Sequence, residues 1–307
     1  MLVLFLSGCQ RIHYNMEPAI VYTPQVDQIA QLPTAFPPLT KEEESQPWAQ
    51  ELITGDAFAK ELDLYRAITS YKRAHILIPK NQSERILQLD YDIFLAYYLG
   101  GKYQDAVNTF EQSSLVEVTP AFPAFSTLIT ALYDCYRELG QCERAESILK
   151  VIEKGSSETA GDMALYTLLM DGQLIEAQPL ICEHPKKITL EQSLDLYYSL
   201  AKSPSKARTL NAVLPGAGYY YVGQKNSAVT SFLINSLFIA AAYQFFNRGY
   251  VAAGLITTSL EAGWYLGGIN GAGIEAEEFN THLYEQTAKN MMIQADLFPV
   301  LTFQTAF

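Results

Sequence analysis

Residues 55–79 read GDAFAKELDLYRAITSYKRAHILIP, and this stretch decides the fold. Its apolar and small residues recur at intervals of three and four, which predicts helix and not strand. Three small residues would let two helices approach closely, and two aromatic rings would fill the space between them: Gly55, Ala67, Ala74, Phe58 and Tyr71. Pro79 would end the second helix, because proline cannot donate the next backbone hydrogen bond. The stretch therefore predicts a pair of antiparallel helices.

Two further copies of this pattern follow at a constant interval. The alanines Ala67, Ala106 and Ala145 are spaced 39 residues apart. In each copy a glycine turn precedes the second helix; the copies comprise Gly101, Tyr103, Ala106 and Phe110, and then Gly140, Cys142, Ala145 and Leu149. A degenerate fourth copy contains Gly172, Leu174, Ala177 and, inside its second helix, Pro179. Regular spacing of this kind predicts a stack of helical hairpins.

These spacings resemble those of tetratricopeptide repeats, and the resemblance covers residues 48–201, about half of the chain. It implies a superhelix of helix pairs whose concave face holds a peptide or a partner protein, without catalysis. Phe94 and Tyr133 depart from the pattern, since small residues are usual at their positions. We therefore expect wider packing in the second and third repeats. The alternative is an irregular helical bundle with coincidental alanine spacing.

The composition limits the possible functions. Lys and Arg number 21 against 33 Asp and Glu, and the resulting net charge of −12 argues against a nucleic-acid partner. The chain shows no zinc-ligand spacing, phosphate-binding loop or nucleophile elbow. We therefore expect no catalytic residue, no metal, no cofactor and no enzymatic activity. Cys135 and Cys142 lie seven residues apart and could form a disulfide, although both positions also suit ordinary packing.

The first nine residues, MLVLFLSGC, resemble the end of a bacterial lipoprotein signal peptide. The resemblance implies that Cys9 is acylated and anchors the protein to a membrane, and that Gln10 favours the outer membrane, with the protein facing the periplasm. The apolar stretch is short and no basic residue precedes it, so we expect the true start upstream. Residues 10–47 hold six prolines and predict an extended linker.

Residues 202–274 differ sharply in composition from the repeats. Between Asn226 and Ile274 there is one basic residue, Arg248, and one acidic residue, Glu261. Residues 227–246 and 250–268 predict two helices joined by a tight turn, and each is about as long as a bilayer is thick. An ionisable residue in such a segment is a candidate for function, although Glu261 could equally cap the turn or pair with Arg248.

A glycine-rich motif precedes this hairpin and consists of Pro215, Gly216, Gly218, Tyr221 and Gly223. It resembles the P-G-x-G-x-x-Y-x-G motif of a bacterial family of short hydrophobic hairpins, which implies membrane contact and no chemistry. Three arrangements stay open: the hairpin packs on the helical domain, dips into one leaflet, or spans the inner membrane. Basic residues ahead of it would suit a cytoplasmic flank: Lys202, Lys206, Arg208 and Lys225.

Residues 275–307 begin as an acidic helix and end in an apolar segment that we expect to dock as an extended tail. The whole sequence predicts an all-α fold, a tetratricopeptide-like solenoid followed by a hydrophobic two-helix hairpin. We expect a membrane-anchored adaptor of the bacterial envelope that binds a protein partner in the repeat groove and meets membrane lipid at the hairpin. The alternative is an inner-membrane component with a transport-related hairpin and a cytoplasmic docking arm.

Overall fold

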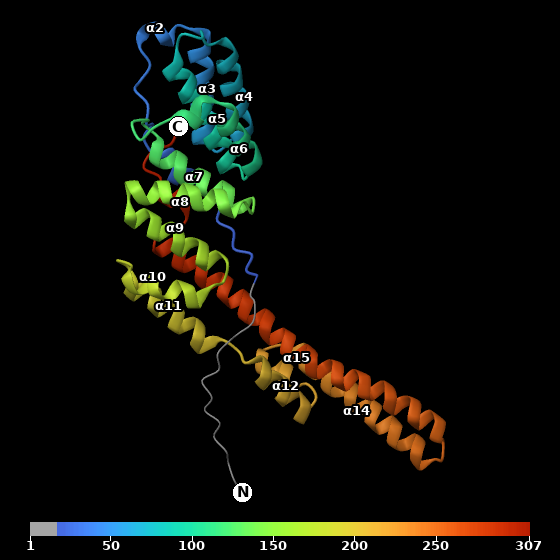
Figure 1. The fold of residues 1–307 in the computed structure, drawn as a ribbon. Coiled ribbons are helices and arrows are strands. Elements are labelled where there is room, and N and C mark those ends of the chain that lie inside the picture. The colour runs from blue at the N-terminus through green and yellow to red at the C-terminus, as the bar shows by residue number, and fades with distance from the viewer. Residues whose placement is uncertain (1–16) are drawn as a thin grey trace. The chain divides into compact units, whose positions relative to one another are not determined.

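The computed structural model describes residues 17–307, and the regular structure of this part is helical (Figure 1). It contains no strand; an isolated bridge joins Thr34 and Ala306. Helices that are neighbours in the chain pack against each other, so the all-α prediction is confirmed. The chain divides into two compact units. We call residues 21–168, 176–182 and 292–307 the solenoid unit, and residues 17–20, 169–175 and 183–291 the hairpin unit.

Antiparallel helix pairs build the solenoid unit. The bounds are α3 Pro47–Lys60, α4 Leu64–Leu77, α5 Ser83–Leu99, α6 Tyr103–Gln112, α7 Phe125–Glu138 and α8 Cys142–Gly155. A 3₁₀ turn, η1 (Ser114–Glu117), follows α6. Two further helices, α9 (Ser157–Met170) and α10 (Leu174–Glu183), correspond to the degenerate copy, and Pro179 lies inside α10. Pro79 directly follows Ile78, the residue that caps the end of α4.

Each helix pair turns through one residue in the left-handed region. The φ angle is 56° at Leu62, 65° at Gly101 and 68° at Gly140, at the same 39-residue spacing as the alanines. The following backbone N–H then reaches the carbonyl five residues earlier, as from Lys102 to Tyr97 at 2.9 Å. This bond satisfies a carbonyl that the end of the helix leaves open. Leu62 occupies the equivalent turn position in the first repeat. The sequence did not predict a turn there, because leucine rarely adopts a positive φ angle.

The small residues of the repeats lie where helices touch. Ala67, Ala106 and Ala145 are buried. A Cβ atom added to Gly55 would overlap the Tyr71 ring, so this ring packs directly on the backbone of α3. At the position of Gly55 the next two repeats carry Phe94 and Tyr133, which are also buried. Ala74 is buried as well, while Phe58, Tyr103 and Phe110 pack at the edge of the core.

Replacing a turn glycine should separate backbone strain from packing. At Gly101 and Gly140 a Cβ would meet no other atom within 4 Å, so Gly→Ala costs only the left-handed conformation. Each change should lower the free energy of unfolding by about 1–2 kcal/mol in a urea titration. Gly161 is the control, because it lies in α9 with equally open space, and there Gly→Ala should stabilise by about 0.5–1 kcal/mol. If Gly→Ala changed the free energy of unfolding in the same direction at all three sites, the assignment of Gly101 and Gly140 to left-handed turns would be contradicted.

The segment before α3 is not a free linker, and this corrects the prediction for its described part. It forms two short helices, α1 (Val26–Ala30) and α2 (Lys41–Glu44). Ile29 and Phe36 are buried in the solenoid core, where the Phe36 ring packs edge-on to Tyr91 with centroids 5.5 Å apart. Composition suggested an extended tether because prolines are frequent, but the apolar residues between them bury against helices. Cys9 and Gln10 lie outside the described residues.

The C-terminal segment docks on the solenoid unit as an extended tail, as expected. It contains a 3₁₀ turn, η2 (Pro299–Thr302), and then extends to residue 307. Three aromatic rings attach it to three different helices: Phe298 to Tyr166 of α9, Phe303 to Tyr98 of α5, and Phe307 to Tyr71 of α4. The Ala306 N–H donates to the Pro33 carbonyl at 3.0 Å, so the tail also holds the N-terminal segment.

Removing one ring of the tail should destabilise the solenoid unit. Phe303 is buried, and Phe303→Ala should lower the free energy of unfolding by about 3–5 kcal/mol, because a cavity replaces the ring. The measurement is urea unfolding of the full chain followed by circular dichroism. Gln304→Ala, at the exposed neighbouring position, should leave the midpoint unchanged. Equal midpoints for Phe303→Ala and the parent protein would show that the tail does not contribute to the core.

The hairpin unit contains α11 (Lys187–Leu200), α12 (Pro204–Val213), α13 (Ala217–Val222), α14 (Lys225–Asn247) and most of α15 (Val251–Gln294). Two predicted boundaries change. First, α11 groups with the hairpin and not with the repeats. Second, α15 runs unbroken through residue 274, because the acidic residues that follow continue the helix without a glycine or proline to end it.

The possible disulfide between Cys135 and Cys142 is not formed. Cys135 is buried in α7, whereas Cys142 is exposed at the start of α8. Burial raises the pKa of the Cys135 thiol, so this residue acts as a small apolar side chain in the core.

Candidate functional site

The glycine-rich motif at the base of the hairpin brings α13 into close contact with three other helices. Gly216 has φ of 90°, and a Cβ there would overlap the Ala228 carbonyl oxygen of α14. At Gly218 a Cβ would overlap the Ala207 carbonyl oxygen of α12 and crowd Ala272 of α15. Only glycine fits both positions, because backbone and side-chain atoms already fill the space. The motif therefore fixes how the hairpin begins.

Polar groups of the same motif complete this junction. The Asn211 side chain accepts a hydrogen bond from the Gly216 N–H at 2.8 Å. Gly223, with φ of 96°, ends α13 in the left-handed conformation. The Tyr221 hydroxyl accepts from the Ser203 N–H at 3.1 Å. Asn211 is buried and was not identified from the sequence, since no motif marks it.

Two lysines share the Tyr221 ring. The Nζ atoms of Lys206 and Lys202 lie 5.0 and 5.3 Å from its centroid, within the range of cation–π attraction. Arg208 instead pairs with Glu277 at 3.0 Å. Pro215 lines an apolar groove beside these residues. The base of the hairpin thus combines positive charge with apolar surface.

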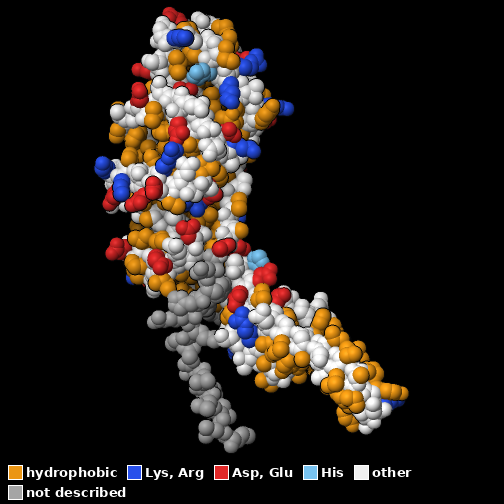
Figure 2. Space-filling view, turned by 45° about the vertical axis from the view of Figure 1, so that its right-hand side comes forward, with side chains coloured by type: hydrophobic (Ala, Val, Ile, Leu, Met, Phe, Trp, Pro, Cys, Tyr) orange, Lys and Arg blue, Asp and Glu red, His pale blue; other side chains and the backbone are white. Residues whose placement is uncertain are grey.

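The hairpin has small and polar residues inside and large apolar residues outside. The residues of α14 that are buried are Ala228, Ser231, Asn235 and Ala242. On the outside, large apolar side chains of α14 and the first half of α15 are exposed (Figure 2): Val229, Phe232, Leu233, Leu237, Ile239, Tyr243, Phe246, Val251, Leu255, Ile256, Leu260, Trp264 and Leu266. Among the described helices, α14 is the one long and apolar enough to cross a membrane by length and composition. Within the hairpin unit, the large apolar side chains of these two helices therefore point away from the helix pair.

Glu261 lies on the inner face of the hairpin. It is 8% exposed, and neither of its carboxylate oxygens has a hydrogen-bond partner among the described residues. Pairing with Arg248, one of the alternatives that the sequence left open, is not formed, since Arg248 lies against the Gln244 amide at 2.9 Å. The Asn235 side-chain oxygen of α14 is likewise buried without a partner.

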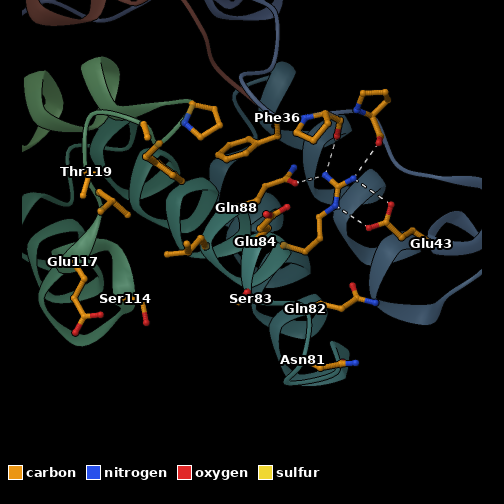
Figure 3. Close-up of a pocket in the computed structure, with 18 of the residues that line it drawn as sticks. Phe36, Glu43, Asn81, Gln82, Ser83, Glu84, Gln88, Ser114, Glu117 and Thr119 are labelled. Carbon is orange, nitrogen blue, oxygen red and sulfur yellow. Dashed lines mark hydrogen bonds and ion pairs between the residues drawn. The ribbon is translucent and has the colours of Figure 1, made fainter.

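A second candidate is an open cavity of about 1070 Å³ in the solenoid unit, at the start of α5 (Figure 3). Its wall includes Arg85, whose guanidinium donates to Glu43 at 3.0 and 3.2 Å, to the Pro37 and Pro38 carbonyls, and to Gln88. These partners occupy its donors, so Arg85 is not available to hold an anionic ligand. It ties the N-terminal segment to α5 instead.

A buried carboxylate, that of Asp134, is a third feature, and no motif in the sequence marks it. Asp134 accepts hydrogen bonds from the Tyr98 and Tyr166 hydroxyls at 2.9 and 3.0 Å and lies beside Arg137. Burial raises the pKa of Asp134, while Arg137 and the two tyrosines oppose that rise. These two tyrosines are the ones that contact Phe298 and Phe303 of the tail, so this network orients a docking surface. No group of three potential metal-ligating residues occurs in residues 17–307.

Glu43 gives this region a specific acid sensitivity. The Arg85 hydrogen bonds lower the pKa of Glu43 from 4.5 to about 2. A lowered pKa stabilises the fold above pH 4.5, and this contribution is lost as the pH falls toward 2. Glu43→Gln should lower the free energy of unfolding by about 1–3 kcal/mol at pH 7 and much less near pH 2, measured by urea titration. Glu42→Gln, next to it and exposed, should show no such pH-dependent difference.

No protein-family model, curated protein or solved structure matches this chain.

Proposed function

We propose that this protein is a non-enzymatic, membrane-anchored scaffold whose α14–α15 hairpin inserts into a lipid bilayer. One observation carries the proposal: the large apolar side chains of the hairpin face outward, and its small and polar residues face inward. In water such an arrangement leaves an apolar surface that soluble monomers rarely expose. In lipid it is favourable, because small residues bring the helices together and the outer side chains contact acyl chains.

The dimensions of the hairpin suit this role. The 23 residues of α14 extend for about 35 Å, slightly more than the hydrocarbon thickness of ~30 Å. The turn between the two helices carries Arg248, which would lie at the far interface of the bilayer. The base of the hairpin carries the basic residues that precede α14. These residues would lie at the near interface of the bilayer. Between these ends, the helices hold a single ionisable residue, Glu261, on the inner face.

The proposed scaffold has two membrane attachments in the bacterial envelope. Acylation of Cys9, implied by its resemblance to a lipoprotein cysteine, would add a second anchor to the hairpin. The tetratricopeptide-like solenoid would then present a protein partner at the membrane surface. The cavity beside Arg85 supports this part of the proposal, because it is open and mixes apolar and polar side chains.

The test removes the first anchor and then alters the second. Cys9→Ser protein should stay in carbonate-washed membranes, because the hairpin alone suffices. Adding Leu237→Lys and Leu260→Lys, both at exposed positions near the middle of the hairpin, should release it. Each lysine costs about 2.5–3.5 kcal/mol at the centre of a membrane helix. The fraction is measured by immunoblotting of membrane pellet and supernatant.

The matched control places the same change on the solenoid unit. Tyr65 and Ile76 of α4 are more than 80% exposed, and Tyr65→Lys with Ile76→Lys should leave the protein in the pellet. If the Cys9→Ser protein is soluble and monomeric without detergent, the hairpin is not a membrane segment and the proposal is wrong.

A transport role for the hairpin is the second candidate, and Glu261 is the observation that favours it. Its carboxylate is buried on the inner face with no partner in the described chain. Unpaired ionisable groups inside membrane segments commonly belong to ion or proton pathways. A single hairpin provides two helices, so a pathway lined by Glu261 would require several copies of the chain around it.

A further inference from the structure

An open apolar groove of about 770 Å³ lies at the base of the hairpin, between α12, α13 and α14. Its wall is formed mainly by Leu210, Leu214, Pro215, Val229, Phe232 and Leu233. The volume falls within the range of about 300–1,000 Å³ that is usual for small-molecule sites. Leu214, Phe232 and Leu233 are about half exposed, so the groove is open along one side.

Basic residues are concentrated in this part of the chain, and acidic residues are absent from it. Although the net charge of the protein is −12, residues 196–260 contain no Asp or Glu and five basic residues. Four of the five lie at or before the start of α14, which is the base of the hairpin: Lys202, Lys206, Arg208 and Lys225. A locally positive surface next to a membrane segment attracts anionic headgroups.

Lys206 is the basic residue that lines the groove itself. Its Nζ atom lies over the Tyr221 ring, and no carboxylate of the described chain comes within ion-pair distance. Arg208 differs, because Glu277 neutralises it. Lys202 shares the Tyr221 ring and adds a second positive charge on the same side. The groove therefore has an unneutralised cationic end and an apolar wall.

We propose that the groove binds one anionic phospholipid, with its phosphate at Lys206 and an acyl chain against Leu210, Phe232 and Leu233. The inference rests on the proposed function, since insertion of the hairpin brings the groove to the headgroup level. Charge complementarity selects the occupant: an amphiphile with a negative head and an apolar tail satisfies both parts of the site. A free inorganic phosphate would satisfy only Lys206, and a neutral lipid would satisfy only the wall.

The experiment uses the full chain in a mild detergent and native mass spectrometry. Phosphatidylglycerol and phosphatidylcholine with the same acyl chains are titrated separately, and inorganic phosphate is added as a competitor. One molecule of phosphatidylglycerol should bind per protein, more tightly than phosphatidylcholine, and millimolar phosphate should not displace it. Lys206→Gln should weaken binding of phosphatidylglycerol about fivefold, in line with the attraction expected for one basic residue. Leu214→Asn should weaken binding of both lipids.

The control is Lys72→Gln. Lys72 of α4 also lies over a tyrosine ring, 5.1 Å from the Tyr97 centroid, but it is not among the residues that line this groove, so lipid binding should not change. Equal affinity for the two lipids, an unchanged Lys206→Gln protein or displacement by phosphate would each overturn the inference. Lys206→Gln should stay in carbonate-washed membranes like the parent protein. Absence of a lipid preference together with normal membrane retention would contradict only the proposed lipid site. Absence of membrane retention in the Cys9→Ser protein would contradict the proposed insertion of the hairpin.

Discussion

Close approach of helices at positions without a side chain sets the geometry of both units. In the solenoid unit, Gly55 lets the Tyr71 ring lie on the backbone of α3, and that ring in turn receives Phe307 of the tail. In the hairpin unit, Gly216 and Gly218 bring α13 against α14, α12 and α15. A single methyl group at any of these glycines would overlap atoms already in place. The rest of each unit depends on these contacts, because the larger side chains pack only once the helix axes are this close.

Local features of the fold could be predicted because they depend on local physics. The alanine spacing, the glycine turns and the uncharged stretch after residue 225 each gave an element that the structure contains at that place. Docking of the N-terminal segment could not be predicted from composition. The prolines there indicated an extended chain, and whether Ile29 and Phe36 find a core depends on distant helices. Burial of Asp134 was missed for the same reason, because its tyrosine partners come from α5 and α9.

The hairpin and the solenoid differ in the polarity of their surfaces. The solenoid follows the ordinary rule, with alanine, leucine and aromatic residues inside. The hairpin reverses this rule, with Ser231, Asn235 and Glu261 inside and leucines outside. A reversed polarity is unfavourable in water, yet it is the normal arrangement for helices that lie in lipid. Sequence hydropathy detects the apolar length of α14, whereas the direction of each side chain requires the packed pair of helices.

The docked tail covers part of the surface of the solenoid helices. The tetratricopeptide resemblance implies a partner on the concave face of the helix pairs. Within the solenoid unit, Phe298 and Phe303 of the tail already contact tyrosines of α9 and α5. Any peptide that bound to these tyrosines would have to displace buried aromatic rings, at a cost of several kcal/mol for each ring. The cavity at the start of α5 requires no such displacement, since Arg85 and Glu43 close its wall without filling it. The cavity therefore stays open while the tail is docked, and residues of the N-terminal segment, from Phe36 to Glu43, form part of its wall.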